Sequence, residues 1–154
     1  MIPEKYIVPM SSPDISEEDL QAVAQVLQSR YLSLGPKIIE FEDALRRYTG
    51  SRHAIGVSSG TSGLHLCVRA AGVQGGDLVI TTPFSFVSPT NVILFEGAIP
   101  VFVDIDPLSG NIDSEQVAQA ARGLSSHKAA ERAKWLPRRH TAQIGKLRAI
   151  LAVD

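Results

Sequence analysis

Small and hydroxyl-bearing residues gather between two apolar stretches in the segment "HAIGVSSGTSGLHL", residues 53–66. They are Ser58, Ser59, Gly60, Thr61, Ser62 and Gly63. At the start of a helix the first backbone N–H groups lack intrahelical partners and carry a partial positive charge. Glycines let the backbone approach a ligand, and a hydroxyl adds a donor. The pattern therefore suits a phosphate site. It matches neither the P-loop nor the G-x-G-x-x-G motif, so a simple turn is equally compatible with it.

Two aromatic residues, Phe84 and Phe86, follow a predicted strand in the segment "DLVITTPFSFV". Apolar side chains at such positions ordinarily belong to the core, and we expect this of Phe84. Beside a phosphate-binding turn, an aromatic face can instead stack on a flat heterocycle. The turn and the aromatic pair together suggest a phosphorylated aromatic cofactor.

Other chemistry-bearing residues indicate no further site. The histidines and the single cysteine lack metal-ligand spacing, so we predict no metal site. They are His53, His65, His127, His140 and Cys67. His65 is interpreted as a packed helix residue rather than a base. One cysteine excludes an intrachain disulfide, which is compatible with a reducing compartment.

Composition is that of an ordinary globular domain. The chain has 154 residues, 44% of them hydrophobic, and a net charge of -1. This charge favours neither nucleic acid nor an anionic membrane as a partner. No apolar run reaches the length of a membrane span and the amino terminus lacks a signal-peptide core, so we expect a cytoplasmic location.

The elements that position these residues follow from periodicity and punctuation. Helices are predicted over 14–30 and 37–50, so 1–52 is interpreted as an amino-terminal helical segment. Strands are predicted at 53–57, 77–82, 99–106 and 146–153, with helices between them at 62–72, 88–98 and 114–123. This alternation predicts the α/β class, with a parallel or mixed sheet flanked by helices, over 53–154.

Basic residues concentrate late in the chain. Between Arg122 and Arg148, both included, there are eight lysines or arginines and one acid, Glu131. We interpret about 124–146 as an insertion between a helix and a strand. It is either a solvated excursion with a short helix anchored by Trp135, or an arm that meets a neighbouring subunit or a phosphate-rich substrate.

The chain resembles the pyridoxal-phosphate-dependent sugar aminotransferases of the DegT/DnrJ/StrS group, which belong to the fold-type I aminotransferase superfamily. The matching stretches are "GPKIIEFEDALRRYTG", "AIGVSSGTSGLHL", "GDLVITTPFSFVSPTN" and "GAIPVFVDIDP". They occur in the family order and extend over roughly 10–113. The resemblance implies that residues 53–154 are part of the large cofactor-binding domain.

Roles for particular residues come from this resemblance. Gly60, Thr61 and Ser62 match the turn that holds the cofactor phosphate, and Phe86 matches the aromatic residue that stacks on the pyridine ring. The loop "YLSLGP" matches a segment near the active site that is often at a dimer interface. Asp104 and Asp106 match a recurrent feature that we interpret as structural.

The resemblance also implies the reaction. The cofactor is pyridoxal 5'-phosphate, and the family transfers an amino group from glutamate or glutamine to a nucleotide-linked keto-sugar, in cell-surface polysaccharide or amino-sugar biosynthesis. The implied partners are the nucleotide-sugar substrate, the amino-acid donor and a second copy in a homodimer, with neither nucleic acid nor membrane.

One family feature has no match. None of the lysines lies in a motif like that of the Schiff-base lysine, which we expect beyond Asp154. They are Lys5, Lys37, Lys128, Lys134 and Lys146. We therefore expect this chain to be the amino-terminal portion of the enzyme, inactive alone. The alternatives are a keto-sugar dehydratase of the same family and a non-catalytic fragment.

Overall fold

The computed structural model describes residues 11–137 and 143–153. The chain divides into two compact units, one up to Gly56 and one from Val57 onward. Each unit is described by itself below. The sheet belongs to the second unit. So does the turn with the small and hydroxyl-bearing residues 58–63, called the phosphate-type turn below.

The first unit contains helices α1 (Glu17–Leu27) and α2 (Pro36–Thr49). Ser16 caps α1: its hydroxyl accepts a hydrogen bond of 3.2 Å from the Asp19 N–H, while the Asp19 carboxylate accepts one of 2.8 Å from the Ser16 N–H. This reciprocal pair is a capping box, which satisfies two N–H groups that would otherwise lack partners. At the carboxyl end of α2, Gly50 adopts a left-handed conformation with φ of 68°. This conformation favours glycine, and it ends the helix.

The strand predicted at 53–57 does not form, and that prediction is wrong. Within the first unit, the Gly56 N–H donates a hydrogen bond of 2.7 Å to Glu42 Oε1 on α2. A side chain thus takes a backbone donor that a strand would commit to a neighbouring strand. Short apolar runs carry no information about whether a partner strand is available, which explains the error.

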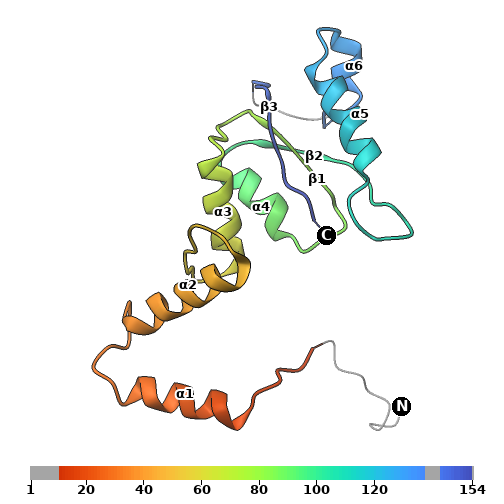
Figure 1. Ribbon diagram of the computed structural model, residues 1–154. Coiled ribbons are helices and arrows are strands. Elements are labelled where there is room, and N and C mark those ends of the chain that lie inside the picture. The colour runs from red at the N-terminus through yellow and green to blue at the C-terminus, as the bar shows by residue number, and fades with distance from the viewer. Residues whose placement is uncertain (1–10, 138–142, 154) are drawn as a thin grey trace, which may run out of the picture. The chain divides into compact units, whose positions relative to one another are not determined.

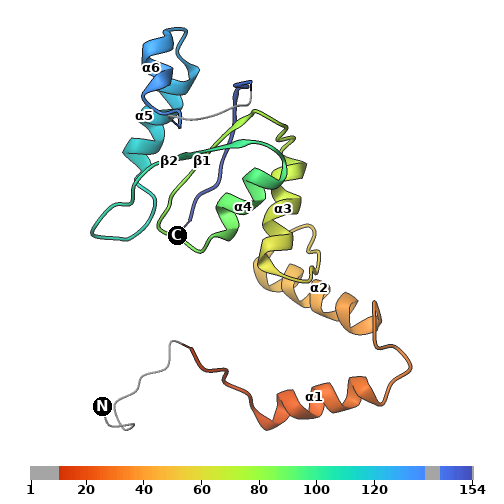
Figure 2. The same ribbon diagram turned by 180° about the vertical axis from the view of Figure 1, so that it is seen from behind.

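The second unit is a parallel three-stranded sheet with helices on both faces (Figures 1 and 2). Its strands are β1 (Leu78–Thr81), β2 (Ile99–Phe102) and β3 (Leu147–Ile150), in the order β2-β1-β3. Its helices are α3 (Gly60–Ala70), α4 (Ser88–Phe95), α5 (Ser114–Ser125) and α6 (Ala129–Ala133). The predicted fold class, a parallel sheet flanked by helices, is confirmed.

The strand order explains why helices cover both faces. The chain leaves β1 through α4 to reach β2 on one side, and then returns past β1 through α5 and α6 to β3 on the other side. Right-handed crossovers in opposite directions place their helices on opposite faces of a sheet. Figures 1 and 2 show α3 and α4 on one face and α5 with α6 on the other.

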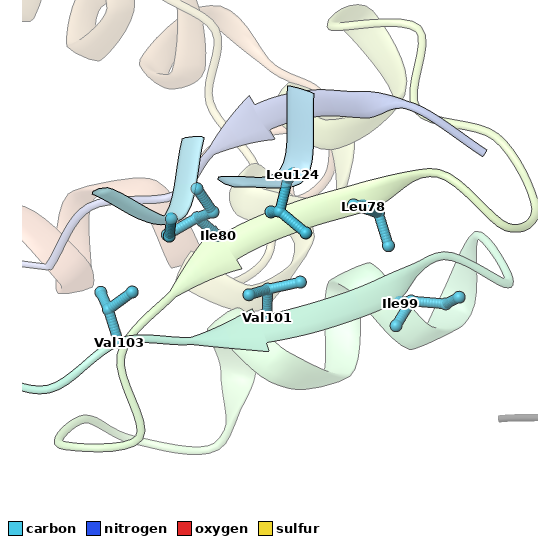
Figure 3. Packing of buried hydrophobic residues seen from close by; sticks show 7 residues of the cluster. Leu78, Ile80, Ile99, Val101, Val103 and Leu124 are labelled. Carbon is cyan, nitrogen blue, oxygen red and sulfur yellow. The ribbon is translucent and has the colours of Figure 1, made fainter. Parts of the chain in front are cut away.

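Two hydrophobic clusters hold these layers, and β1 contributes to both. Leu78 and Ile80 face α5 and pack with its Leu124, in a cluster that also includes residues of β2 (Figure 3). Val79, between them in sequence, faces the opposite way and packs with Val92 of α4 and further residues of α3 and α4. Side chains alternate along a strand, so four consecutive buried residues are what a strand covered on both faces requires.

The basic segment begins as the continuation of the α5 face. After α5 comes the short helix α6, and Trp135 and Leu136 pack against the cluster that contains Leu124. Trp135 therefore packs on the core, as the first of the two interpretations of this segment expects. Residues 138–142 of the predicted insertion, with His140 among them, lie outside the described residues.

Candidate functional site

The phosphate-type turn is itself the first turn of α3. Ser59 is the N-cap, and its hydroxyl accepts a hydrogen bond of 3.1 Å from the Ser62 N–H. Its carbonyl accepts the Gly63 N–H, also at 3.1 Å. The Gly60 and Thr61 N–H groups have no acceptor among the described residues. They are the free donors at the positive end of the helix, as an anion site requires.

A cavity of about 490 Å³ opens beside these donors. Four parts of the second unit line it: the start of α3, the loop after β1, the start of α4 and the segment after β3. The lining residues are Gly60, Thr61, Leu64, Ser85, Phe86, Ser88, Pro89, Leu151, Ala152 and Val153. Because the strands are parallel, the segments that follow β1 and β3 meet at the same carboxyl edge, where ligands bind in open α/β sheets.

The predicted site residues are partly brought together. Gly60, Thr61 and Phe86 line the one cavity. Ser62 is not among its lining residues, and its hydroxyl lies 2.9 Å from the Ser59 hydroxyl within the helix cap. The geometry gives Ser62 a capping contact, and its role toward a cofactor remains a prediction.

The two phenylalanines lie differently from each other, and Phe84 is not a core residue. Phe84 is 65% exposed and Phe86 is 77% exposed in the structure. Phe84 borders a separate shallow cavity with Pro83 and Ser85, whereas Phe86 borders the larger cavity. The prediction of a buried Phe84 fails because the strand ends at Thr81. Beyond it the chain turns, with the Phe84 N–H donating to Thr82 Oγ1 at 3.3 Å, and strand alternation no longer decides which side chains are buried.

Gly60 occupies a place where the described chain does not itself require glycine. A Cβ at this position would meet no atom within 4 Å, and Gly60 is not among the glycines with positive φ. Gly60 itself is one of the residues that line the cavity. A ligand held against the Gly60 N–H would account for the missing side chain, since only glycine allows the closest backbone approach.

Ser88 is a site residue that the sequence analysis missed. It begins α4, is only 7% exposed, and its hydroxyl lies 2.7 Å from the Thr61 hydroxyl. Leu151, Ala152 and Val153 were missed as well, because their place in the site depends on the pairing of β3 with β1. The common carboxyl edge of parallel strands was the available signal for the segment after β3.

Two other polar residues singled out from the sequence, Asp106 and His65, have local structural contacts. Asp106 accepts hydrogen bonds from the N–H groups of Ser109 and Leu108, at 2.7 and 2.9 Å. The bonds from Ser109, with that from Leu108, lower the pKa of the Asp106 carboxyl. His65 Nε2 lies 2.6 Å from Glu96 Oε1, and its ring meets Phe95 edge to face. His65 thus packs α3 against α4.

The described residues contain neither a metal-binding group nor a helix that could span a membrane. Within residues 11–137 and 143–153, no three His, Cys, Asp or Glu side chains form a group that could hold a metal ion. None of the helices in this described part has the length and apolarity needed to cross a bilayer.

The chain is similar to proteins of known family. The family model described as the DegT/DnrJ/EryC1/StrS aminotransferase family matches residues 13–129. Spore coat polysaccharide biosynthesis protein SpsC of Bacillus subtilis (strain 168) is 42% identical over 115 residues, which are 75% of this chain and 30% of that protein. The UDP-4-amino-4-deoxy-L-arabinose–oxoglutarate aminotransferase of Shewanella sediminis (strain HAW-EB3) is 46% identical over 99 residues, 64% of this chain and 26% of that protein.

Solved structures agree with the sequence relatives. The structure of Spr1654 from Streptococcus pneumoniae in its pyridoxal-phosphate (PLP) form matches with a TM-score of 0.70 and 35% identity. The match covers 75% of this chain and 29% of that one. The chain spans 26% to 31% of the length of the curated relatives. From the match over most of its residues, this chain belongs to the DegT/DnrJ/EryC1/StrS aminotransferase family.

Proposed function

We propose that this chain supplies the phosphate-binding and ring-binding part of a pyridoxal 5'-phosphate site in a sugar aminotransferase. The observation that carries the proposal is the convergence of Gly60, Thr61 and Phe86 on one cavity at the carboxyl edge of the sheet. Two free N–H donors and a hydroxyl suit a phosphate dianion, and an exposed aromatic face suits a pyridine ring. Residues 53–154 are then part of the cofactor-binding domain.

The residues present fit this cofactor. The cavity of about 490 Å³ is within the range of small-molecule sites. The space beside Gly60 leaves its N–H accessible, and Thr61 brings a hydroxyl to the same end. The apolar lining of Leu64, Pro89 and Leu151 suits the body of an aromatic ligand better than a free inorganic anion.

Each of these residues has a definite task in the proposed site. The N–H groups of Gly60 and Thr61 bind the phosphate, with the hydroxyl of Thr61 as a third donor. Phe86 covers one face of the ring and excludes water from it. When bound, pyridoxal phosphate supplies an electron sink for bond breaking at the amino-bearing carbon of the donor.

The names of two relatives support a proposal for the substrates. The Shewanella relative is named for a UDP-linked amino sugar and oxoglutarate, and the Bacillus relative for spore coat polysaccharide biosynthesis. We therefore propose that the whole enzyme transfers an amino group between an amino acid and a nucleotide-linked keto-sugar, for polysaccharide or amino-sugar synthesis, as a homodimer.

A ligand titration tests the cofactor assignment. The chain is titrated with pyridoxal phosphate and, separately, with pyridoxal, which lacks the phosphate, and binding is followed by absorbance and by quenching of Trp135 fluorescence. We expect clear preference for pyridoxal phosphate, and loss of at least about tenfold in its affinity in Thr61→Val, because a charge-assisted hydrogen bond contributes about 1.5–3 kcal/mol. Equal affinity for the two ligands would contradict the proposal.

A further inference from the structure

The contact between Thr61 and Ser88 joins two helices at the cavity. The two hydroxyl oxygens lie 2.7 Å apart, although the residues are 27 positions apart in sequence. Ser88 is more than nine-tenths buried, and both residues line the cavity. Thr61 Oγ1 is the one hydrogen-bond partner of the Ser88 hydroxyl among the described residues.

Each hydroxyl has a single proton, so the direction of this hydrogen bond matters. If Thr61 donates to Ser88, Thr61 presents only lone pairs to the cavity, and these repel an anion. If Ser88 donates to Thr61, the Thr61 proton is free to point into the cavity. An anion beside Thr61 therefore selects the second direction.

The hydroxyl of Ser88 is not needed to hold the two helices together. Helices α3 and α4 already pack through Val68, Val92 and Ile93, all of them buried. Ser88 is the first residue of α4 rather than its N-cap, so its side chain does not cap that helix. A buried hydroxyl at the cavity wall, bonded to the residue that faces the ligand, is better explained by an effect on that residue.

We infer that Ser88 is a positioning residue that donates its proton to Thr61 Oγ1 and so directs the Thr61 hydroxyl proton toward the phosphate of the bound ligand. This inference rests on the proposed function. A chain of hydrogen bonds that ends on an anion is strengthened cooperatively, because each donor polarises the next. In this arrangement Ser88 acts on the phosphate through Thr61.

A double-mutant cycle on ligand affinity tests this inference. Affinity for pyridoxal phosphate is measured for the unmodified chain, Ser88→Ala, Thr61→Val and the double variant. We expect Ser88→Ala to weaken binding by about threefold, from the lost polarisation and the freed rotation of the Thr61 hydroxyl. In the Thr61→Val background, Ser88→Ala should change the affinity no further. Affinity for pyridoxal should be unchanged by Ser88→Ala, which separates a phosphate effect from a general loss of structure.

The outcomes separate the two proposals. If the unmodified chain does not prefer pyridoxal phosphate over pyridoxal, the proposed function fails and this inference fails with it. If the preference is present but unchanged in Ser88→Ala, only this inference is overturned. An equal loss from Ser88→Ala with and without the Thr61 hydroxyl also overturns it, because Ser88 then acts independently of Thr61. Unfolding by urea, measured on each variant, confirms that the compared chains are folded.

Discussion

The carboxylate of Asp77, the residue just before β1, pairs with the guanidinium of Arg148 on β3, with 3.1 Å between Asp77 Oδ2 and Arg148 Nε. The side chain of Asp77 is 9% exposed and that of Arg148 is 30% exposed. Burial raises the pKa of Asp77, but the hydrogen bonds from Arg148 and from the Gln74 N–H, with the charge of Arg148, lower it further than burial raises it. The carboxylate is therefore ionised and paired in the folded protein.

Removal of Arg148 is expected to destabilise the fold in a pH-dependent way. Arg148→Met leaves a buried carboxylate without its ion partner, at a cost of about 3 kcal/mol near neutral pH. A carboxyl with a lowered folded pKa contributes stability above its unfolded pKa of about 3.9, and this contribution is lost as the pH falls through the folded pKa. The difference in the free energy of unfolding between the variant and the unmodified chain should thus shrink below about pH 4. Urea unfolding at pH 7 and pH 3 measures it.

A matched control comes from the first unit. Arg46 and Asp43 also lie 3.1 Å apart, but both side chains are close to half exposed. Arg46→Met should cost less than about 1 kcal/mol, because solvent screens an exposed pair. Equal losses from Arg148→Met and Arg46→Met would show that burial of Asp77 does not control the energetics of its pair.

Thr81 offers a stabilising substitution. Its hydroxyl oxygen is buried at the end of β1 and has no hydrogen-bond partner among the described residues. Valine has nearly the same shape without the hydroxyl, so Thr81→Val should raise the free energy of unfolding by about 1 kcal/mol. Thr82→Val is the control, because the Thr82 hydroxyl accepts the Phe84 N–H and its loss should destabilise. A destabilised Thr81→Val chain would indicate a partner for that hydroxyl in solution.

Phe86 and Phe84 should respond differently to truncation. If Phe86 stacks on the cofactor ring, Phe86→Ala should weaken pyridoxal phosphate binding by about fivefold, since an aromatic contact contributes about 0.5–1.5 kcal/mol. Phe84→Ala should leave that affinity unchanged, because Phe84 does not line the cavity. Neither variant should approach the loss of about 3–5 kcal/mol in stability typical of a buried phenylalanine. Control of binding by Phe84 instead would mean that the residues of this loop are assigned in the wrong register.

Gly60→Ala separates stability from binding. Alanine favours a helix over glycine by about 0.5–1 kcal/mol, and its Cβ would meet no atom here, so the free energy of unfolding should not fall. In the proposed site a phosphate approaches the backbone at this position, so the same methyl group would obstruct it and affinity for pyridoxal phosphate should drop. Parallel titration and urea unfolding of this one variant measure both effects. An unchanged affinity would exclude close approach of the ligand to residue 60.

Most helices of the structure were predictable because residues close in sequence, at the caps, determine where each helix begins and ends. Ser16 with Asp19 begins α1, and Gly50 and Gly97, both with positive φ, follow the ends of α2 and α4. The strand order was not predictable, since pairing of Leu78 with Leu147 is a contact between residues far apart in sequence. For the same reason, Ser88 and the segment after β3 could not be recognised as site residues from the sequence. It also produced the errors at 53–57 and Phe84, where an apolar run or residue was assumed to have a partner.

The position of β1 between two hydrophobic clusters has a consequence for folding. Loss of this one strand removes the partner of α5 and the partner of α3 and α4 together, so the two layers are expected to open in a single cooperative step. In native-state hydrogen exchange, the amides of Val79 and Ile80 should then share one protection free energy with those of Val92 and Leu124. Both strand pairings also join residues distant along the chain, so this step must overcome a large loop-closure entropy and should be slow.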